Sequence, residues 1–227
     1  MNVALVTGAN RGIGKEVCKQ LADKGYQVLL GSRSLEKGQQ AVQELGHSAI
    51  TPIQIDVTDQ ASVDQAAKKI QSKYQKLDVL VNNAGINYDD HERAISVDLQ
   101  DVQNTMETNL YGPWRCTTAM LPLLHKSNNP RIVNVSSGAG SLSGMSGGTP
   151  AYGVSKAALN ALTLKLAREL SSTMRVNAVC PGWIATDMGG AGGGPIPEGA
   201  ASVVWACTLD KNGPTGGFFR HGKAIPW

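Results

Sequence analysis

The chain has 227 residues, which is enough for one α/β domain with a substantial core. Its formal net charge of +3 is spread over scattered basic residues, and this excludes a strongly basic nucleic-acid or membrane-surface protein. No apolar run approaches the roughly 20 residues that cross a bilayer. A strand-like run starts near the N-terminus with no basic leader before it, so we expect a cytoplasmic protein.

The cysteines show no pattern typical of a metal site or of a disulfide framework. They lie far apart, with no CxxC or Cys/His spacing. We therefore predict reduced, buried thiols and no bound metal. The four are Cys18, Cys116, Cys180 and Cys207.

Short aliphatic runs alternate with longer amphipathic runs along most of the chain. The aliphatic runs predict strands at Val3–Thr7, Gln27–Gly31, Thr51–Asp56, Val79–Asn82, Arg131–Ser136 and Arg175–Cys180. The amphipathic runs predict helices near 12–24, 34–45, 60–74, 98–125 and 152–172. In the tail, residues 213–220 predict a turn and a last strand at the edge of the sheet.

Nearly continuous apolar strands separated by helices are typical of a parallel sheet that is covered on both faces. Right-handed crossovers then give a doubly wound, mostly parallel sheet of seven strands, with ligands at the carboxyl ends of the strands. We find no internal repeat and no linker. Residues 1–227 are therefore predicted to form a single α/β domain.

A glycine-rich turn follows the first predicted strand. Residues Thr7–Gly14 read TGANRGIG and lead directly into a predicted helix. The glycines allow a tight turn and a close approach to a ligand, and the helix N-terminus offers amide donors to a pyrophosphate. Glycine clusters are common in turns, but this position in an alternating chain indicates a dinucleotide site.

Tyr152 and Lys156 are four residues apart, so they share one face of a helix. An ammonium near a phenol favours the phenolate, and we expect the pKa of Tyr152 to fall from about 10 towards neutrality. Such a group suits proton exchange with a carbonyl or alcohol oxygen. On its own, this pair is more commonly a solvated helical pair.

Together, these motifs resemble the short-chain dehydrogenase/reductase family. The turn fits TGxxxGxG rather than GxGxxG, and further matches follow in order: NNAG at Asn82–Gly85, Asn109, Ser136–Ser137, YxxxK at Tyr152–Lys156, and Pro181–Gly182. Within the family the chain is most similar to the carbonyl reductases, through TGANRGIG, GSR at 31–33, TDMGG at 186–190 and the GGFF tail. The resemblance implies a Rossmann fold and hydride transfer between a nicotinamide and a carbonyl carbon.

The resemblance also implies four catalytic residues. Tyr152 would supply the proton, while Lys156 would lower the pKa of Tyr152 and hold the nicotinamide ribose. Ser137 would donate a hydrogen bond to the substrate oxygen, and Asn109 would fix a water that relays protons. Ser137 rather than Ser136 matches the catalytic serine of the family, and alternation along a strand lets only one of them face the pocket.

The end of the second predicted strand indicates which dinucleotide binds. NAD sites typically place an acid there, whereas this chain has Ser32 followed by Arg33, with Arg11 in the glycine turn. Two guanidinium groups would bind the 2′-phosphate of NADP(H). Either arginine alone could instead face solvent.

The remaining predicted cofactor contacts come from the resemblance. Asp56 has an alternative reading as an ordinary turn residue. Besides Ser32, Arg11 and Arg33, the predicted cofactor-binding residues are Gly8, Asn10, Gly12, Ile13, Gly14, Asp56, Val57, Asn83, Ala84, Gly85, Tyr152, Lys156, Pro181, Gly182 and Thr186.

We therefore predict an NADPH-dependent reductase that converts ketones or aldehydes to alcohols. An alcohol dehydrogenase or a 3-oxoacyl reductase would use the same four residues, and a non-catalytic NADP(H)-sensing protein would share the fold. The intact Ser137, Tyr152 and Lys156 argue against a sensor.

Three further segments carry predictions. The loop 137–152 lacks the long insertion of some monomeric carbonyl reductases, so helices 98–125 and 152–172 are expected to pair in a homodimer or homotetramer. Asp89–Glu92 is interpreted as a solvated loop rather than a metal site. The glycine-rich segment 189–195 is interpreted as a flexible loop that could also act as a lid.

Overall fold

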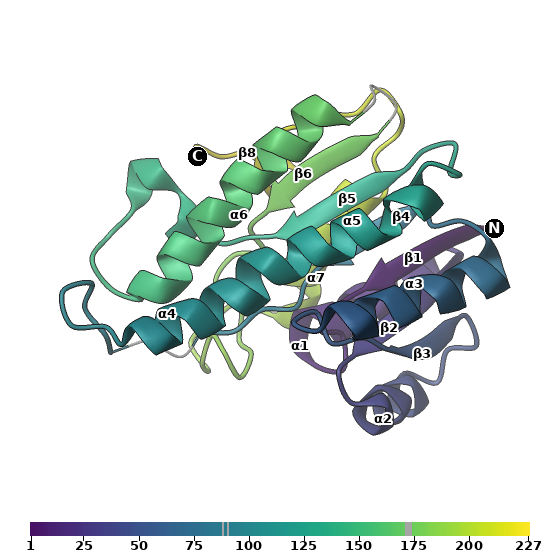
Figure 1. The fold of residues 1–227 in the computed structure, drawn as a ribbon, viewed down its shortest axis with the longest axis horizontal. Coiled ribbons are helices and arrows are strands. Elements are labelled where there is room, and N and C mark those ends of the chain that lie inside the picture. Colours follow the sequence, from purple (N-terminus) through teal and green to yellow (C-terminus); the bar gives the residue numbers. More distant parts are fainter. Residues whose placement is uncertain (88, 90, 171–173) are drawn as a thin grey trace.

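In the computed structural model, which describes residues 1–87, 89, 91–170 and 174–227, the chain forms one twisted sheet between two layers of helices (Figure 1). The spatial order is β3-β2-β1-β4-β5-β6-β7-β8. The strand bounds are β1 (Asn2–Val6), β2 (Tyr26–Ser32), β3 (Ile50–Gln54), β4 (Val79–Asn82), β5 (Arg131–Val135), β6 (Arg175–Val179), β7 (Phe218–Arg220) and β8 (Lys223–Ala224).

The first seven strands are parallel, and only β8 runs antiparallel to its neighbour. From β1 the chain winds outwards to β3, and it then returns to place β4 on the other side of β1. The predicted doubly wound fold is confirmed. In such sheets ligands bind at the carboxyl ends of the strands, where the winding direction reverses.

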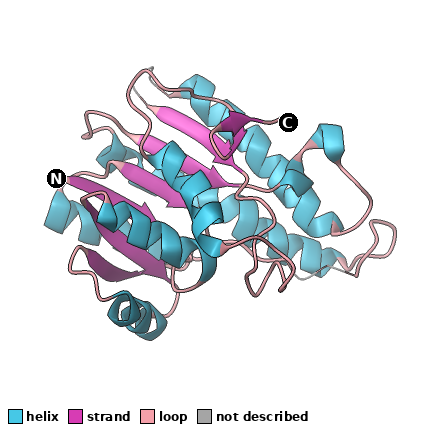
Figure 2. Ribbon diagram, turned by 180° about the vertical axis from the view of Figure 1, so that it is seen from behind, coloured by secondary structure: helices cyan, strands magenta, loops and turns pink. Residues whose placement is uncertain are grey.

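Each face of the sheet has its own helical layer. Helices α3, α5 and α6 contribute to one apolar core, and α1, α2 and α7 contribute to the other. Figure 1 shows the first layer in front of the sheet, and Figure 2 shows the second layer from behind. The bounds are α1 (Gly12–Asp23), α2 (Leu35–Leu45), α3 (Gln60–Tyr74), α4 (Leu99–Met106), α5 (Gly112–Leu124), α6 (Pro150–Glu169) and α7 (Ile196–Cys207).

Alternation along the strands explains the two cores. In β1, Val3 and Leu5 pack into one core, whereas Ala4 and Val6 pack into the other. Successive side chains of a strand point to opposite faces, so a strand buried on both faces is apolar throughout. This burial produces the continuous aliphatic runs seen in the sequence.

The C-terminal edge of the sheet differs from the prediction of seven strands. The chain adds an eighth strand, so β7 is paired on both sides and β8 forms the edge. Between them, His221 and Gly222 have φ angles of 50° and 74°. Two consecutive positive φ angles are typical of the tight turn that closes a two-residue hairpin, and this turn was not recognised in the sequence.

Two helical regions also differ from prediction. Helix α7 was missed because its start follows the glycine-rich segment, although Ala200, Val203, Val204 and Cys207 form a buried stripe at helical spacing. The predicted helix 98–125 is α4 and α5 joined by a π-helical turn, Glu107–Tyr111. Residues 171 and 172, at the end of the predicted helix 152–172, lie outside the described residues.

All four cysteines are unpaired and buried. Burial raises the pKa of Cys116 and of Cys207 to about 12, so these thiols stay protonated at neutral pH. The predicted reduced, buried thiols are confirmed.

Within the part of the chain that the structure describes, no helix is long and apolar enough to span a bilayer. A cytoplasmic location stays a prediction.

Candidate active site

Three of the four predicted catalytic residues lie on two neighbouring elements at the carboxyl end of the sheet. Ser137 lies two residues after the end of β5, and Tyr152 and Lys156 lie on the first turns of α6. Beside them opens a cleft of about 480 Å³, which Ser137 and Tyr152 line together with Pro181. The cleft lies at the edge of the sheet where ligands of doubly wound folds bind.

The two serines at the end of β5 have different environments. The Ser136 side chain is 2% exposed, and its Oγ donates a 2.7 Å hydrogen bond to Asn160 Oδ1. The Ser137 side chain instead lies beside the Tyr152 phenol, where it lowers the pKa of Tyr152, and its Oγ accepts a 3.2 Å hydrogen bond from Ala139 N. Ser137 is therefore the serine beside Tyr152, but both serines line the cleft, so the prediction that only one of them faces it is wrong. Both follow the last residue of β5, where strict alternation no longer applies.

The pKa of Tyr152 lies in the opposite direction from the prediction. Burial raises it above the ordinary value of 10, while the hydrogen bond from Ser137 lowers it by a smaller amount and Cys180 raises it further. Lys156 Nζ lies 5.6 Å from the centre of the phenol ring and donates a 2.9 Å hydrogen bond to Val135 O. The expected fall towards neutrality is wrong, because burial of the phenol has the largest effect on its pKa.

Lys156 is itself a buried cation. Its side chain is 4% exposed, and burial lowers its pKa to about 8, an effect that Cys180 partly opposes. A Cβ atom built on Gly85 would lie 3.4 Å from Lys156 Nζ and 3.3 Å from Asn109 Oδ1. Glycine at position 85 therefore lets the NNAG loop approach both side chains.

Asn109 lies inside the π-helical turn and is fully buried. Its Oδ1 accepts a 2.9 Å hydrogen bond from Ile86 N, and its Nδ2 donates to Ile86 O and to Ser155 Oγ. Ser155 Oγ in turn donates to Tyr152 O at 2.7 Å. Asn109 thus joins the loop after β4 to the helix that carries Tyr152. A water held near Asn109 stays a prediction.

Asp89 was wrongly interpreted as part of a solvated loop. It is 2% exposed, and its Oδ2 accepts hydrogen bonds of 2.6 Å from Ala151 N and 3.4 Å from Tyr152 N. A carboxylate at this position satisfies free amides at the start of α6 and interacts favourably with the helix dipole. Asp90, in the same predicted loop, lies outside the described residues.

The glycine turn between β1 and α1 fits a dinucleotide pyrophosphate. Gly8 has a φ of 61°, and a Cβ atom there would lie 2.7 Å from the Cα of Ala84. Asn83 Nδ2 fixes the turn by donating to Thr7 O and Gly8 O. Arg11 precedes α1 without capping it, so the first amides of the helix remain available for an anion.

The predicted 2′-phosphate residues do not all lie as expected. Arg33 is exposed at the end of β2, whereas the Ser32 side chain is buried. Arg11 forms an ion pair with Asp187, in the loop after β6. Among the ion pairs of the described residues, none includes Arg33. Arg33 is therefore the guanidinium that is free to bind a phosphate.

Two further predicted cofactor residues, Asp56 and Val57, lie in and beside the turn before α3. Asp56 Oδ1 accepts hydrogen bonds from Thr58 N at 3.0 Å and from Thr58 Oγ1 at 2.7 Å. Val57 is buried in the core, against Gly112 of α5. The carboxylate of Asp56 thus shapes the turn before α3, as its alternative reading expected.

A family model described as short chain dehydrogenase matches residues 2–192. The chain belongs to the short-chain dehydrogenase/reductase family. Membership confirms the prediction from the motifs, and it makes the protein an oxidoreductase of a family that uses nicotinamide cofactors.

This short-chain dehydrogenase/reductase is similar to several reductases. It is 35% identical to (-)-isopiperitenone reductase of Mentha piperita, over 98% of this chain and 97% of the relative. A carbonyl reductase of chicken fatty liver, solved with NADPH bound, superposes with a TM-score of 0.89 at 29% identity, and both chains are covered completely. The carbonyl reductase Sniffer of D. melanogaster gives the same score at 31% identity and complete coverage of both chains.

The cleft of this short-chain dehydrogenase/reductase contains residues to which the sequence assigned no role. Among the predicted cofactor residues, Ile13, Pro181, Gly182 and Thr186 line the cleft, and Trp183, which follows Gly182, lines it as well. The additional lining residues are Asn87, Ser136, Gly138, Ala139, Cys180, Ile184, Met188 and Arg220, beside Gly189 from the segment predicted as a loop or lid. Most of them follow β5, β6 or β7, so their position at the ends of parallel strands was the available signal.

The glycine-rich segment 189–195 packs beside the cleft. Gly194 N donates a 2.8 Å hydrogen bond to Trp183 O, and Ala185 N donates to Gly194 O at 2.9 Å. The indole Nε1 of Trp183 donates to Gly189 O at 2.7 Å. These bonds fold the segment back on the residues that follow β6, whereas the sequence predicted a flexible loop.

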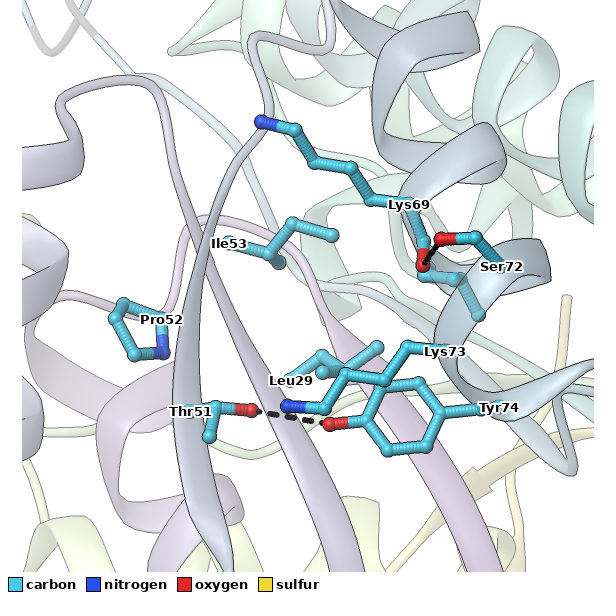
Figure 3. Close-up of a pocket in the computed structure, with 9 residues that line it drawn as sticks. Leu29, Thr51, Pro52, Ile53, Lys69, Ser72, Lys73 and Tyr74 are labelled. Carbon is cyan, nitrogen blue, oxygen red and sulfur yellow. Dashed lines mark hydrogen bonds between the residues drawn. The ribbon is translucent and has the colours of Figure 1, made fainter.

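A second hollow, of about 320 Å³, lies between β3 and α3 (Figure 3). Thr51 and Tyr74 form a 3.5 Å hydrogen bond within it, and Lys69 and Lys73 lie along its rim. Thr51 stands near the start of β3, so this hollow is at the amino end of an edge strand. It lies away from Ser137 and Tyr152, which stand at the carboxyl end of the sheet.

Proposed function

We propose that this protein is an NADPH-dependent carbonyl reductase that converts ketones or aldehydes to alcohols. The observation that carries the proposal is that Ser137 and Tyr152 lie beside each other and line the same cleft. Because burial raises the pKa of Tyr152, its phenol is protonated at neutral pH and ready to act as an acid. Reduction of a carbonyl requires such an acid, whereas alcohol oxidation requires the phenolate and is favoured at alkaline pH.

In the proposed reaction, Tyr152 donates its proton to the carbonyl oxygen as negative charge develops there. Ser137 donates a hydrogen bond to the same oxygen and stabilises that charge. Lys156 stands behind the phenol as a cation that favours the phenolate left after proton transfer. Asn109 keeps α6 in position through Ser155. When bound, the nicotinamide supplies the hydride to the carbonyl carbon.

The choice of NADP(H) rests on the end of β2. This chain has no acid there to bind a ribose 2′-hydroxyl, and the exposed Arg33 follows the buried Ser32. The carbonyl reductase of chicken fatty liver, with the same fold, was solved with NADPH. Pyrophosphate would lie on the amides at the start of α1, against Gly8 and Gly12.

The test is an assay of nicotinamide consumption with a panel of ketones and aldehydes. We expect consumption of NADPH, formation of the alcohol and weaker activity with NADH. An alcohol dehydrogenase would instead reduce NADP⁺ faster at neutral pH, and a 3-oxoacyl reductase would require 3-oxoacyl thioesters. Tight NADPH binding without turnover of any substrate would leave only the sensor alternative and overturn the proposal.

We further propose that the protein assembles as a homodimer or homotetramer through α5 and α6. Tyr111 precedes α5, Trp114 lies on α5 and Val154 lies on α6, and all three expose much of their side chains. Apolar side chains gathered on neighbouring helices are typical of subunit interfaces. Light scattering at micromolar concentration should give twice or four times the chain mass, and a Trp114→Glu variant should give the monomer mass. A wild-type monomer would contradict the proposal.

A further inference from the structure

One cation stands in the catalytic cleft outside the group of four predicted catalytic residues. Arg220 is the last residue of β7 and lines the same cleft as Ser137 and Tyr152. Among the described residues that line the cleft, it alone carries a formal charge at neutral pH. The sequence assigned no role to Arg220.

The guanidinium of Arg220 has little to bind within the protein. Its Nη2 donates to the Sγ of Cys180 at 3.2 Å, and a thiol is a weak acceptor. None of the ion pairs formed by the described residues includes Arg220. A guanidinium has five N–H donors in a planar fork, so most of them remain available to a ligand.

Arg220 lies close to the reacting groups. A Cβ atom built on Gly138, the residue after Ser137, would lie 2.9 Å from the Nη2 of Arg220. The absence of a side chain at position 138 therefore lets the guanidinium approach the backbone beside the catalytic serine. An anion bound by Arg220 would lie in the same cleft as a carbonyl bound by Ser137 and Tyr152.

The hairpin that carries Arg220 is held in place by the rest of the chain. Ser143 N donates to Trp227 O at 3.0 Å, and Ser141 Oγ donates to Pro226 O at 3.0 Å. Phe218 stacks on Trp227 with 5.3 Å between ring centres. Phe218 and Arg220 are two residues apart on one strand, so they project to the same face. The backbone at Arg220 is thus held by the fold, and its side chain, although exposed, is directed to the side of the strand on which Cys180 lies.

We infer that the substrate of this reductase is a carbonyl compound that carries a carboxylate, and that Arg220 binds this carboxylate. The inference rests on the proposed reductase function. A carboxylate matches the guanidinium fork with two parallel, charge-assisted hydrogen bonds. With one end held there, the carbonyl is directed to Ser137 and Tyr152. Arg220 is then the residue that determines specificity for oxo acids.

The experiment compares oxo acids of increasing chain length with their methyl esters. For each pair, kcat/KM is measured with NADPH for wild type, Arg220→Gln and Arg220→Lys. Lys223→Gln is the matched control, because Lys223 pairs with Arg220 across the hairpin and does not line the cleft. NADPH binding to each variant, measured by fluorescence, checks that the cofactor site is intact.

Wild type should prefer the acid over the ester for at least one chain length. In Arg220→Gln, the acid-to-ester ratio of kcat/KM should fall about 10-fold or more, mainly through a higher KM for the acid, because a charge-assisted hydrogen bond is lost. Arg220→Lys should retain part of the preference, and Lys223→Gln should retain all of it.

An equal acid-to-ester ratio in wild type and Arg220→Gln would overturn the inference, as would a wild-type preference for every ester. Failure of the proposed reductase function gives a different result, because neither acids nor esters would then consume NADPH. Should Arg220→Gln fail to bind NADPH, the ratio in Arg220→Lys decides: a ratio equal to that of wild type overturns the inference.

Discussion

The Asp89 carboxylate accepts a 2.6 Å hydrogen bond from the backbone amide of Ala151, the residue before Tyr152. The loop after β4 is thereby fixed to the start of the helix that carries Tyr152 and Lys156. Asn109 makes a second connection between the same two segments, through Ile86 and Ser155. The orientation of α6 therefore depends on residues that are distant in the sequence.

Removing the Asp89 carboxylate should weaken both the fold and catalysis. We expect Asp89→Ala to lower the free energy of unfolding by about 1–2 kcal/mol, because two amides of α6 lose their acceptor. The value of kcat should fall as well, since Tyr152 is at that helix end. Urea denaturation and steady-state kinetics measure the two effects.

Asp98→Ala is the matched control for Asp89→Ala. The Asp98 Oδ1 caps α4 by accepting a 2.8 Å hydrogen bond from Gln100 N, so it caps a different helix from the one that carries Tyr152. The Asp98→Ala variant should have a lower free energy of unfolding than wild type but the same kcat. Equal kcat losses in both variants would show that a general loss of stability, and not the position of Tyr152, explains the effect of Asp89.

The adjacent serines 136 and 137 should behave differently when each is replaced by alanine. Ser137→Ala should lower kcat by about 10²–10³-fold, because the hydrogen bond to the developing oxyanion is lost. Ser136→Ala should mainly cost about 1 kcal/mol of stability, because Asn160 Oδ1 loses its donor. Kinetics and thermal unfolding of the two variants check this division. A larger kcat loss in Ser136→Ala than in Ser137→Ala would reverse the assignment.

Lys156 should lower the stability of the folded chain at neutral pH. Its folded pKa of about 8 lies below the ordinary lysine value of 10.5, so between these values the unfolded state binds more protons. The contribution of Lys156 to the free energy of unfolding therefore rises as the pH rises from about 8 to about 10.5. Below pH 8, burying the ammonium of Lys156 lowers the free energy of unfolding by its full amount.

Replacing Lys156 with an apolar residue tests whether burial of this charge destabilises the fold. Lys156→Met should be inactive and yet more stable than wild type by about 1–3 kcal/mol at pH 7, with a difference that shrinks as the pH approaches 10. Urea denaturation at several pH values measures this. A variant that is less stable than wild type at pH 7 would show that the hydrogen bond to Val135 O outweighs the burial of the charge.

Cofactor preference should depend on Arg33 more than on Arg11. Arg33→Gln should lower the NADPH-to-NADH ratio of kcat/KM about 10-fold or more, since a charge-assisted contact with the 2′-phosphate is lost. Arg11→Gln should have a smaller effect, because Arg11 is already paired with Asp187. Arg168→Gln, at an exposed site on the last turn of α6, is the control. An unchanged ratio in Arg33→Gln would contradict NADP(H) binding through Arg33.

The site residues that could be predicted from the sequence are those whose partners in a motif lie only a few positions away. Gly8, Asn83, Tyr152 and Lys156 belong to short motifs, and the alternation of apolar and amphipathic runs predicted the parallel strands and the helices between them. Asp89 and Arg220 could not be found in this way, because their roles depend on Ala151, Gly138 and Cys180, which lie far away in the chain.

The direction in which the pKa of Tyr152 is shifted also could not be predicted from the sequence. Helical spacing correctly places Lys156 near the phenol, but spacing carries no information on burial. Burial of both side chains is set by how α6 packs on β5 and β6, and it dominates the pKa of each. Likewise, helix α7 has helical periodicity, but the glycine-rich segment before it concealed its start.

The central claim is that Tyr152 donates the proton in an NADPH-dependent carbonyl reduction. Its most direct test is kcat for NADPH oxidation by Tyr152→Phe, with the best carbonyl substrate of wild type, beside Tyr111→Phe, which removes an exposed phenol. We predict that Tyr152→Phe binds NADPH like wild type and loses about 10²–10⁴-fold in kcat, whereas Tyr111→Phe keeps the wild-type rate. A Tyr152→Phe variant with the wild-type kcat would contradict the claim.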